Sequence, residues 1–220
     1  MLKDIKLGFK LLKYSYSFKM NVGLSIFFLV IGSLMMLVGV DSFVFGGVYC
    51  YIGIVIVLQM SYSLLFVQVV SASYTRKMLE ITFPNFISLF GSILWFLILT
   101  VLTKVFSCVR PQLEAEYSAA LVLCSIFMII CMLYYGGCYK YFVVGTVLFS
   151  ITFMVAYIWG RYNLLLLLTK MVGTDLPVAF GIGLVIILIG WAISCLLRKL
   201  LYKKQISPWA MGSNLRKAMQ

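Results

Sequence analysis

The chain contains no histidine and only six acidic residues among its 220 residues. The absence of histidine excludes serine–histidine triads and the H-E-x-x-H zinc motif. The acids lie outside the long apolar runs, so no pair of carboxylates is placed for acid–base chemistry within such a run. No G-x-x-x-x-G-K-[ST] phosphate loop is present. We therefore expect no enzymatic activity, no catalytic residue and no cofactor bound by this chain.

Charge is also missing from six long apolar runs, which contain no Asp, Glu, Lys or Arg. Each is long enough to cross a hydrocarbon core of about 30 Å, which takes about 20 helical residues. With 64% hydrophobic and 11% charged residues, the composition points to lipid rather than to a soluble domain. We predict an all-α integral membrane protein with one transmembrane domain over residues 1–220, in which the six spans are 22–40, 46–72, 85–103, 117–135, 141–159 and 178–197.

The net charge of +12 is unevenly distributed between the segments that join the runs. If the N-terminus is cytoplasmic, the inner segments hold 14 of the 18 basic residues and two of the six acids. The outer segments then carry no net charge. This positive-inside pattern predicts that both termini are cytoplasmic, with residues 198–220 as a basic tail. The charge is thus a topology signal and an attraction to anionic membrane lipid, and does not indicate nucleic-acid binding.

The neutral interior of the runs disfavours ion-driven transport, because proton relays and many cation sites need ionisable groups within the spans. A sodium site built from carbonyls and hydroxyls stays open. The six cysteines form no C-x-x-C pair, and Cys124, Cys131 and Cys138 are about 10 Å apart along a helix axis. That spacing is too wide to share one metal, so we expect no metal site and interpret these cysteines as packing residues.

Residues 1–20 are predicted to form an interfacial amphipathic helix. Apolar residues such as Leu2, Ile5 and Phe9 fall on one helical stripe, with lysines beside it. The apolar faces would lie on the membrane while the lysines reach headgroups. Surface anchoring and docking of a cytoplasmic partner both stay open as roles for this helix. The anchoring lysines are Lys3, Lys6, Lys10 and Lys13.

The second run carries polar side chains at membrane depth, which should face protein or a wet cavity rather than lipid. Helix–helix hydrogen bonding is one explanation, and a substrate path is the other. The candidate path residues are Gln59, Tyr62, Ser63 and Gln68. Between the last two runs, residues 161–176 contain five consecutive leucines, which are too few to cross a bilayer. We favour a short helix that dips into the outer leaflet over a tilted extension of the fifth span.

The cytoplasmic segment 73–84 is short, charged and amphipathic. We expect Pro84 to stop any local helix there and to restart the chain as the third span. This is the one inner loop between spans with the length and chemistry for recognition by another protein. Its residues of interest are Thr75, Arg76, Lys77, Met78, Leu79, Glu80, Ile81, Thr82 and Pro84.

This layout resembles the ABC-2-type transmembrane (permease) subunits of ATP-binding-cassette exporters. Those subunits have an amphipathic N-terminal helix, six spans, a coupling helix after span two and re-entrant outer helices between spans five and six. The matching pieces here are residues 1–20, the six runs, 73–84 and 161–176. The basic-then-leucine-then-proline order of 75–84 is similar to the coupling segment of small permeases. The small outer loops exclude variants with large accessory domains.

The resemblance implies a permease that exports a hydrophobic or amphipathic substrate, such as a peptide or a lipid-like molecule. ATP and Mg would be bound by a separate nucleotide-binding ATPase subunit. Arg76, Lys77 and Glu80 would form the polar face of the coupling segment, and Met78, Leu79 and Ile81 its apolar contacts. The other expected partners are a second permease copy or a paralogue, and membrane lipid. The alternative is a non-transporting six-helix scaffold, immunity or assembly subunit. The short loops, free cysteines and charge bias favour a bacterial plasma membrane.

Overall fold

The computed structural model describes residues 2–15, 18–65, 75–159 and 163–205. These residues contain no β-strand, and six of their helices are long and apolar enough to cross a membrane. The predicted all-α fold, with six helices long and apolar enough to be membrane spans, is therefore confirmed for the part of the chain that is described. The long helices are α2 (Phe18–Met36), α3 (Val40–Leu64), α6 (Phe83–Val109), α7 (Glu114–Gly137), α8 (Phe142–Trp159) and α10 (Leu176–Leu201).

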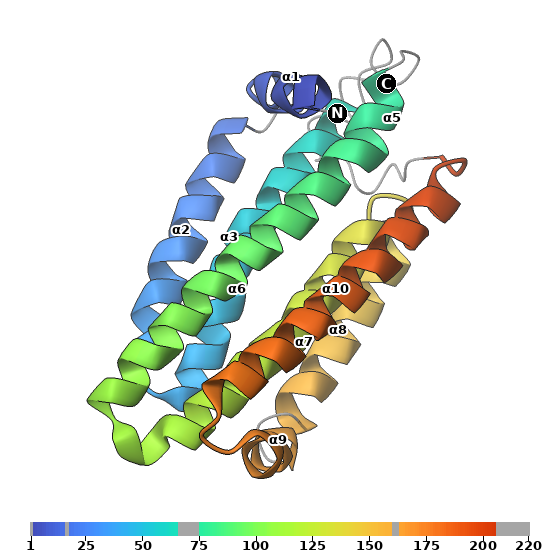
Figure 1. The fold of residues 1–220 in the computed structure, drawn as a ribbon. Coiled ribbons are helices and arrows are strands. Elements are labelled where there is room, and N and C mark those ends of the chain that lie inside the picture. The colour runs from blue at the N-terminus through green and yellow to red at the C-terminus, as the bar shows by residue number, and fades with distance from the viewer. Residues whose placement is uncertain (1, 16–17, 66–74, 160–162, 206–220) are drawn as a thin grey trace.

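Shorter elements connect or flank these helices (Figure 1). A single turn of π-helix separates α5 from α6, and a 3₁₀ turn separates α6 from α7. The short elements are α1 (Leu2–Leu12), α5 (Thr75–Lys77), the π turn η1 (Met78–Thr82), the 3₁₀ turn η2 (Pro111–Leu113) and α9 (Leu165–Val172).

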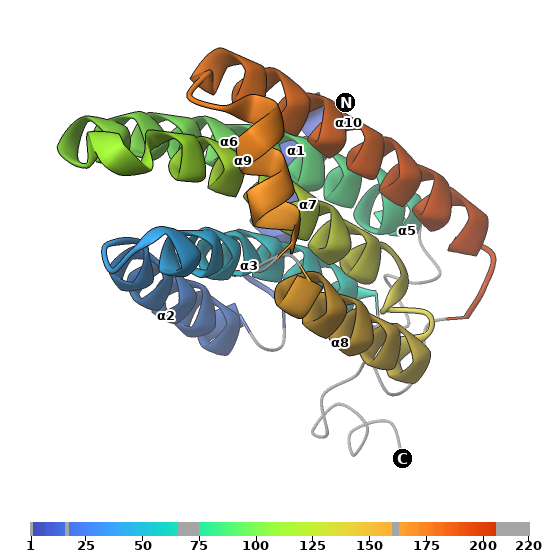
Figure 2. The same ribbon diagram turned by 90° about the horizontal axis from the view of Figure 1, so that it is seen from below.

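Helix α7 lies at the centre of the bundle, and α8 lies at its periphery. Every residue of α7 from Tyr117 to Ser125 is buried, whereas α8 contains no buried residue. Figure 2 shows α7 in the middle, with α6 and α10 on one side of it and α2 and α3 on the other. A helix that is apolar all round and surrounded by other helices belongs to a core. The outer helices keep one face for lipid.

Glycines bring α2 and α3 into close contact. A Cβ atom on Gly32 would lie 2.6 Å from the carbonyl oxygen of Gly46, and one on Gly53 would lie 2.9 Å from the carbonyl oxygen of Ser25. Small residues allow this approach of backbones, which is how helices associate in lipid, where the hydrophobic effect gives them no drive to pair. The glycines therefore allow α2 and α3 to pack closely, and this close packing stabilises the first helical hairpin.

Glycines also bring α10 into close contact with α7 and α6. A Cβ atom on Gly136 would lie 2.8 Å from the Oγ of Ser194, and the ring of Phe96 on α6 fills the space at Gly183 on α10. The Ser194 hydroxyl donates a hydrogen bond to the carbonyl of Met132, at 3.0 Å. A short polar side chain thus reaches across the α7–α10 contact, where hydrogen bonds supplement van der Waals packing.

The helix bounds differ from the predicted runs in an informative way. We expected the first outer turn near residues 41–45, but α3 already begins at Val40 and the chain turns over residues 37–39. Asp41 thereby lies in the first turn of α3, where a negative charge interacts favourably with the helix dipole. Similarly, α10 continues to Leu201, so its last turn includes residues that we assigned to the basic tail.

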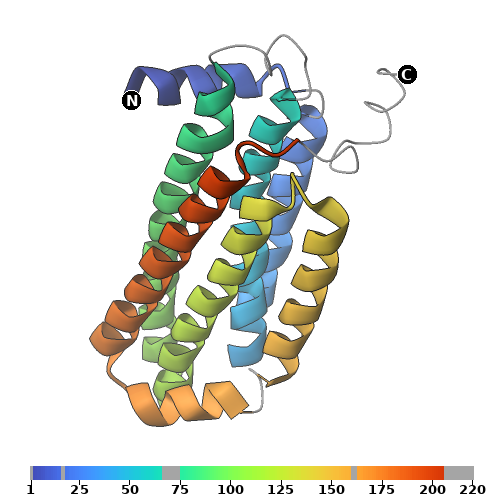
Figure 3. The ribbon, with the colours of Figure 1, turned by 90° about the vertical axis from the view of Figure 1, so that its right-hand side faces the viewer.

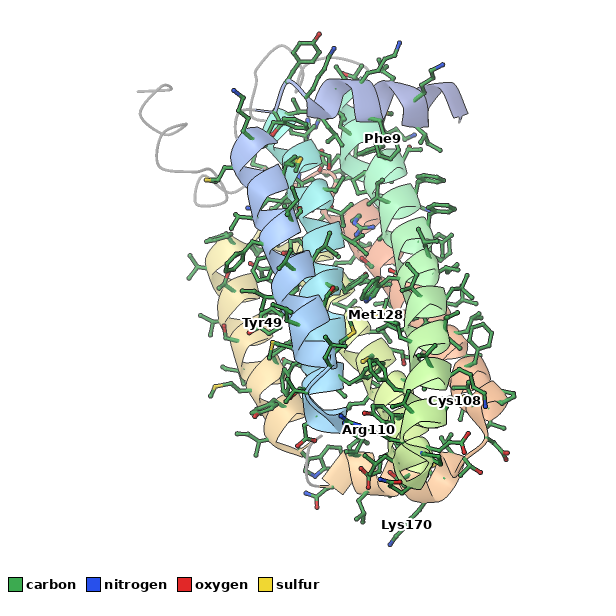
Figure 4. All side chains as sticks on the ribbon, turned by 90° about the vertical axis from the view of Figure 1, so that its left-hand side faces the viewer. Phe9, Tyr49, Cys108, Arg110, Met128 and Lys170 are labelled. Atoms are coloured by element: carbon green, nitrogen blue, oxygen red, sulfur yellow. The ribbon has the colours of Figure 1, made fainter. Side chains whose placement is uncertain are left out.

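Two short helices lie across opposite ends of the bundle (Figure 3). Helix α1 crosses the end that also holds η1, the α7–α8 turn and the C-terminal end of α10, and we call this the basic end. Helix α9 crosses the far end, with Leu168 and Val172 buried. Figure 4 shows Phe9 of α1 and Lys170 of α9 at these two ends. The separate short helix expected in 161–176 is therefore present, and Arg161 lies outside the described residues.

A test of the glycine contact is Gly46→Leu. Its side chain would meet the backbone of Gly32 and the side chain of Met36, so we expect the free energy of unfolding to fall by about 1–3 kcal/mol, as for other overpacked interiors. Thermal unfolding in detergent, followed by tryptophan fluorescence, measures the change. Gly23→Leu on α2 is the matched control, because nothing lies within 4 Å of its Cβ position. Equal losses in both variants would contradict the close contact.

Candidate functional site: a buried ionic cluster at the basic end

The segment that we expected to be a loop is helical and continuous with the third span. Residues Thr75–Val109 form one helical stretch, and Pro84 lies in the first turn of α6 instead of stopping a helix. The reason is the π turn η1, in which the N–H of Phe83 bonds to the carbonyl of Met78 five residues earlier. A wider turn gives the proline ring the room that a normal α-turn would deny it. The predicted boundary at Pro84 is therefore wrong.

The π turn directs Glu80 into the bundle. Its side chain has no exposed surface. One carboxylate oxygen accepts a hydrogen bond from the Nζ of Lys140 at 2.6 Å and another from the Tyr139 hydroxyl at 3.4 Å. The other oxygen accepts from the Nε of Arg76, at 3.2 Å. A carboxylate in such surroundings is stable only when paired and hydrogen-bonded, and all these contacts are charge-assisted.

The cluster also ties down the chain that follows α10. The Nζ of Lys140, with no exposed side-chain surface, donates a second hydrogen bond to the main-chain carbonyl of Lys204, at 2.6 Å. The guanidinium of Arg76 donates to the main-chain carbonyl of Tyr202 at 3.4 Å. It also lies over the aromatic ring of Tyr202, 5.2 Å from the ring centroid. Three segments distant in sequence therefore meet around one carboxylate: 75–82, the α7–α8 turn and the end of α10.

Arg198 forms a second buried charge near the cluster. It is fully buried on α10, and its Nη1 donates to the Oδ1 of Asn85 at 2.7 Å and to the Oγ of Ser88 at 3.2 Å. Its Nε and Nη2 have no hydrogen-bond partner among the described residues. Arg198 lies just past the neutral run 178–197, yet within helix α10, so this long helix includes an ionisable group that the run does not. A buried charge with open donors is costly, and such groups in membrane helices mark functional positions.

The electrostatics of the cluster follow from burial. Desolvation lowers the pKa of Lys140 below its usual value, and the hydrogen bond to Glu80 opposes that effect. Desolvation also raises the pKa of Tyr139, so its hydroxyl keeps its proton and acts as a donor to Glu80. The Tyr139 ring stacks on Tyr62 at a centroid distance of 4.3 Å. Aromatic rings thereby shield the ion pair from water, which strengthens it.

The structure sorts the predicted coupling residues into a buried and an accessible set. Lys77 is exposed, while Thr75, Arg76, Ile81 and Thr82 are half-buried. Glu80 is therefore not on the accessible polar face that we expected for the coupling segment. Met78 and Leu79, expected as apolar contacts with a partner, instead face the bundle. The buried members of the segment are Met78, Leu79, Glu80 and Pro84.

The candidate path residues do not gather in one place. Gln59 is exposed on the outside of α3, whereas Tyr62 is buried against Tyr139. The Ser63 hydroxyl lies 2.8 Å from that of Ser15, just after α1. Gln68 lies outside the described residues. Helix packing accounts for the positions of Tyr62 and Ser63.

The anchor lysines lie on α1 or directly after it, and α1 packs on the bundle through other residues. Ile5 and Leu12 are buried, and the ring of Phe9 meets that of Phe83 edge-on, at 5.1 Å between centroids. Lys6 and Lys10 on α1, and Lys13 just after it, are exposed, and Lys3 belongs to the same helix. The exposed lysines and Lys77 therefore share the basic end.

Sequence reasoning missed Lys140, Tyr139, Arg198 and Asn85 as members of a site. The charge distribution alone indicates a topology charge at Lys140 and the start of a basic tail at Arg198. One signal was present: Lys140 is the only charged residue between Glu116 and Arg161, and Glu80 is the one acid in the inner segments after residue 4. An isolated acid and an isolated base on the same predicted side of a membrane are candidates for pairing.

A test of the ion pair is Lys140→Met, which leaves Glu80 buried without its shortest contact. Breaking a buried pair by removing one partner costs about 3–5 kcal/mol, so we expect a loss of that size in the free energy of unfolding. Adding Glu80→Met should restore part of it, because the unpaired charge is then gone. Lys104→Met is the control: Lys104 is exposed and Glu114 half-buried in their pair at 3.7 Å, and such solvent-accessible pairs contribute about 0–1 kcal/mol. Similar losses at both pairs would refute the buried cluster.

Arg198→Met should behave differently from Lys140→Met. It removes a buried charge that has two open donors, and it leaves only the neutral groups of Asn85 and Ser88 without their donor. Replacement of a buried ion by an apolar side chain of similar volume is often close to neutral. We expect the free energy of unfolding to change by less than about 2 kcal/mol. A loss as large as that of Lys140→Met in the same unfolding assay would show that Arg198 holds the fold together.

Comparison of the chain with models of protein families, with curated protein sequences and with solved structures finds no match. The features of this protein that bear on its function are therefore its long helices, the buried cluster and the exposed residues of the basic end.

Proposed function

We propose that this protein is the transmembrane permease subunit of an ABC exporter. It would move a hydrophobic or amphipathic substrate out of the cell, using ATP hydrolysed with Mg by a separate nucleotide-binding subunit. The basic end would face the cytoplasm of a plasma membrane, in keeping with the positive-inside distribution of charge. A second permease copy or a paralogue would complete the transporter. Six long apolar helices support the membrane part of this proposal.

The observation that carries the proposal is the buried pairing of Glu80 with Lys140. Segment 75–82 is the region that would contact the ATPase, and Glu80 joins it to the α7–α8 turn and to the chain after α10. A displacement of this segment would therefore act on three parts of the bundle at once. Coupling between sites needs such a physically connected network, together with two states that the ligand distinguishes.

Arg198 supplies a reason for a second state of the basic end. Its two open donors raise the free energy of the arrangement described here. A second arrangement of α6 and α10 could give these donors an acceptor. The hydrogen bonds gained there would offset part of the packing lost, so the free energies of the two arrangements would lie closer together. ATP binding in the partner subunit would then shift the populations by its differential affinity for the two states.

The accessible residues define where the ATPase would dock. Lys77 is exposed and Arg76 half-buried at the start of the segment, and α1 places Lys6 and Lys10 at the same end of the molecule. Met78 and Leu79 face the bundle, so they would transmit motion instead of contacting the partner. The docking surface proposed here is consequently basic, and it suits an acidic groove on the ATPase.

The first experiment is purification of the tagged chain from its native host in mild detergent, with identification of the proteins that remain bound. A stoichiometric ATPase subunit would support the exporter. A preparation without ATPase, repeated in lipid nanodiscs, would favour the scaffold, immunity or assembly subunit.

A charge reversal then tests the docking surface. We expect Lys77→Glu to lower ATPase co-purification and substrate-stimulated ATP hydrolysis about tenfold, because like charges at an interface repel. The variant leaves the Glu80–Lys140 pair untouched, so the melting temperature should stay unchanged. Lys170→Glu, on exposed α9 surface at the far end, is the matched control. Undiminished binding and transport in Lys77→Glu would remove the role assigned to segment 75–82.

A further inference from the structure

An apolar groove runs along the side of the bundle between α7, α8 and α10. Its volume is about 380 Å³. In Figure 3, α8 and α10 lie on the two sides of α7. Aliphatic and aromatic side chains dominate the lining, and they include Ile130, Leu133, Tyr134, Leu148, Phe149 and Leu197.

The groove lies in the half of the bundle nearest the basic end. Its lining on α7 comes from the last turns, that on α8 from the first turns, and that on α10 from Leu197 and Leu201. The outward side chains of α8 around it, such as Val144 and Leu148, are more than half exposed. Because these helices are long and apolar enough to span a membrane, the groove opens sideways to hydrocarbon and not to water.

Two exposed lysines follow the end of α10, a few residues after the lining residue Leu201. Lys140, between the lining residues Cys138 and Tyr141, binds the carbonyl of Lys204. The N–H of Lys204 in turn bonds to the carbonyl of Leu201, which lines the groove, at 2.9 Å. The turn after α10 is thereby held beside the groove, and the side chains of Lys203 and Lys204 remain exposed there.

We infer that this groove binds one anionic phospholipid of the adjoining leaflet. An acyl chain of the lipid would fill the apolar groove, while the lipid phosphate would interact with Lys203 and Lys204. A second copy of this chain fits less well, because it would bring the same lysines and the same net positive charge to the groove. The inference requires only that the helices span a membrane, and it holds whether or not the protein is an exporter.

The test is native mass spectrometry of the full chain in detergent, titrated with phosphatidylglycerol or with phosphatidylcholine. We expect one tightly bound phosphatidylglycerol, with an affinity about tenfold or more above that of phosphatidylcholine, since each lysine at a membrane surface adds attraction for an anionic lipid. Lys203→Gln with Lys204→Gln should abolish this preference without changing phosphatidylcholine binding. Lys6→Gln with Lys10→Gln removes two exposed lysines elsewhere on the basic end and should leave the preference intact.

Filling the groove tests the acyl chain separately. Leu148→Trp should weaken phosphatidylglycerol binding about tenfold, the ratio expected when contact with two methylene groups is lost. Ile151→Trp is the matched control, because Ile151 lies on the same helix, is exposed to the same degree (57% against 58%) and does not line the groove. Val144→Trp fills the groove from another position, in case Leu148→Trp does not fold.

Three results would overturn the inference. One is equal binding of the two lipids by the unaltered chain. Another is phosphatidylglycerol binding that survives both tryptophan substitutions in the groove. The third is a dimer that Leu148→Trp dissociates while lipid binding stays constant, which would assign the groove to a second copy of the chain. None of these measurements uses an ATPase, so failure here leaves the exporter proposal standing.

Discussion

The basic end of this protein depends on one buried carboxylate. Glu80 has no exposed surface, and Lys140, Arg76 and Tyr139 all donate to it. Removing a charge from water costs several kcal/mol, so Glu80 stays buried only while its partners stay in place. The π turn that directs it inward, the turn between α7 and α8 that presents Lys140, and the chain after α10 held by Lys140 are consequently one interdependent unit. Outside this end, close packing of neutral side chains and glycines makes most of the contacts between the described helices, with the accessible Lys104–Glu114 pair between α6 and α7 in addition.

The spans could be predicted from sequence because lipid imposes a simple requirement on a chain. A helix must present about 20 apolar residues to the hydrocarbon, and six runs meet that condition. The predicted ends at residues 40, 103 and 197 precede a charged residue, and such a charge is a poor marker of a helix end where it has a partner inside the protein. Arg198 ends an apolar run in the sequence, but Asn85 and Ser88 accept its hydrogen bonds, so α10 continues past it. Ending a span at a charge treats that charge as a border with water, whereas a paired charge can lie within a bundle.

The site was predictable in position but not in geometry. The pattern of basic and apolar residues in 75–84 indicates the correct part of the chain. It does not predict which of these side chains are buried or what they contact. Pro84 predicts a helix boundary from local sterics, but a single π turn removes the steric conflict. The pairing of Glu80 with Lys140 joins residues 60 positions apart in sequence, and it requires knowledge of which helices are neighbours. Periodicity within one helix carries no such information, because it reports which face is apolar and not what covers that face.

The distribution of glycines and charges indicates where this bundle resists motion and where it allows motion. Gly32 and Gly46 close the α2–α3 contact, and Gly136 with Ser194 closes the α7–α10 contact. Separating either pair would open gaps along closely packed backbones, with loss of many dispersion contacts at once. The contacts of Arg76 and Lys140 with the chain at the end of α10 are of another kind, because they are directional hydrogen bonds from charged groups to main-chain carbonyls, and Arg198 nearby has two donors without a partner among the described residues. Directional contacts break and re-form as discrete alternatives, whereas close packing deforms little. If the bundle changes shape, we therefore expect the change to begin at the basic end and to carry the two glycine-packed pairs as rigid bodies.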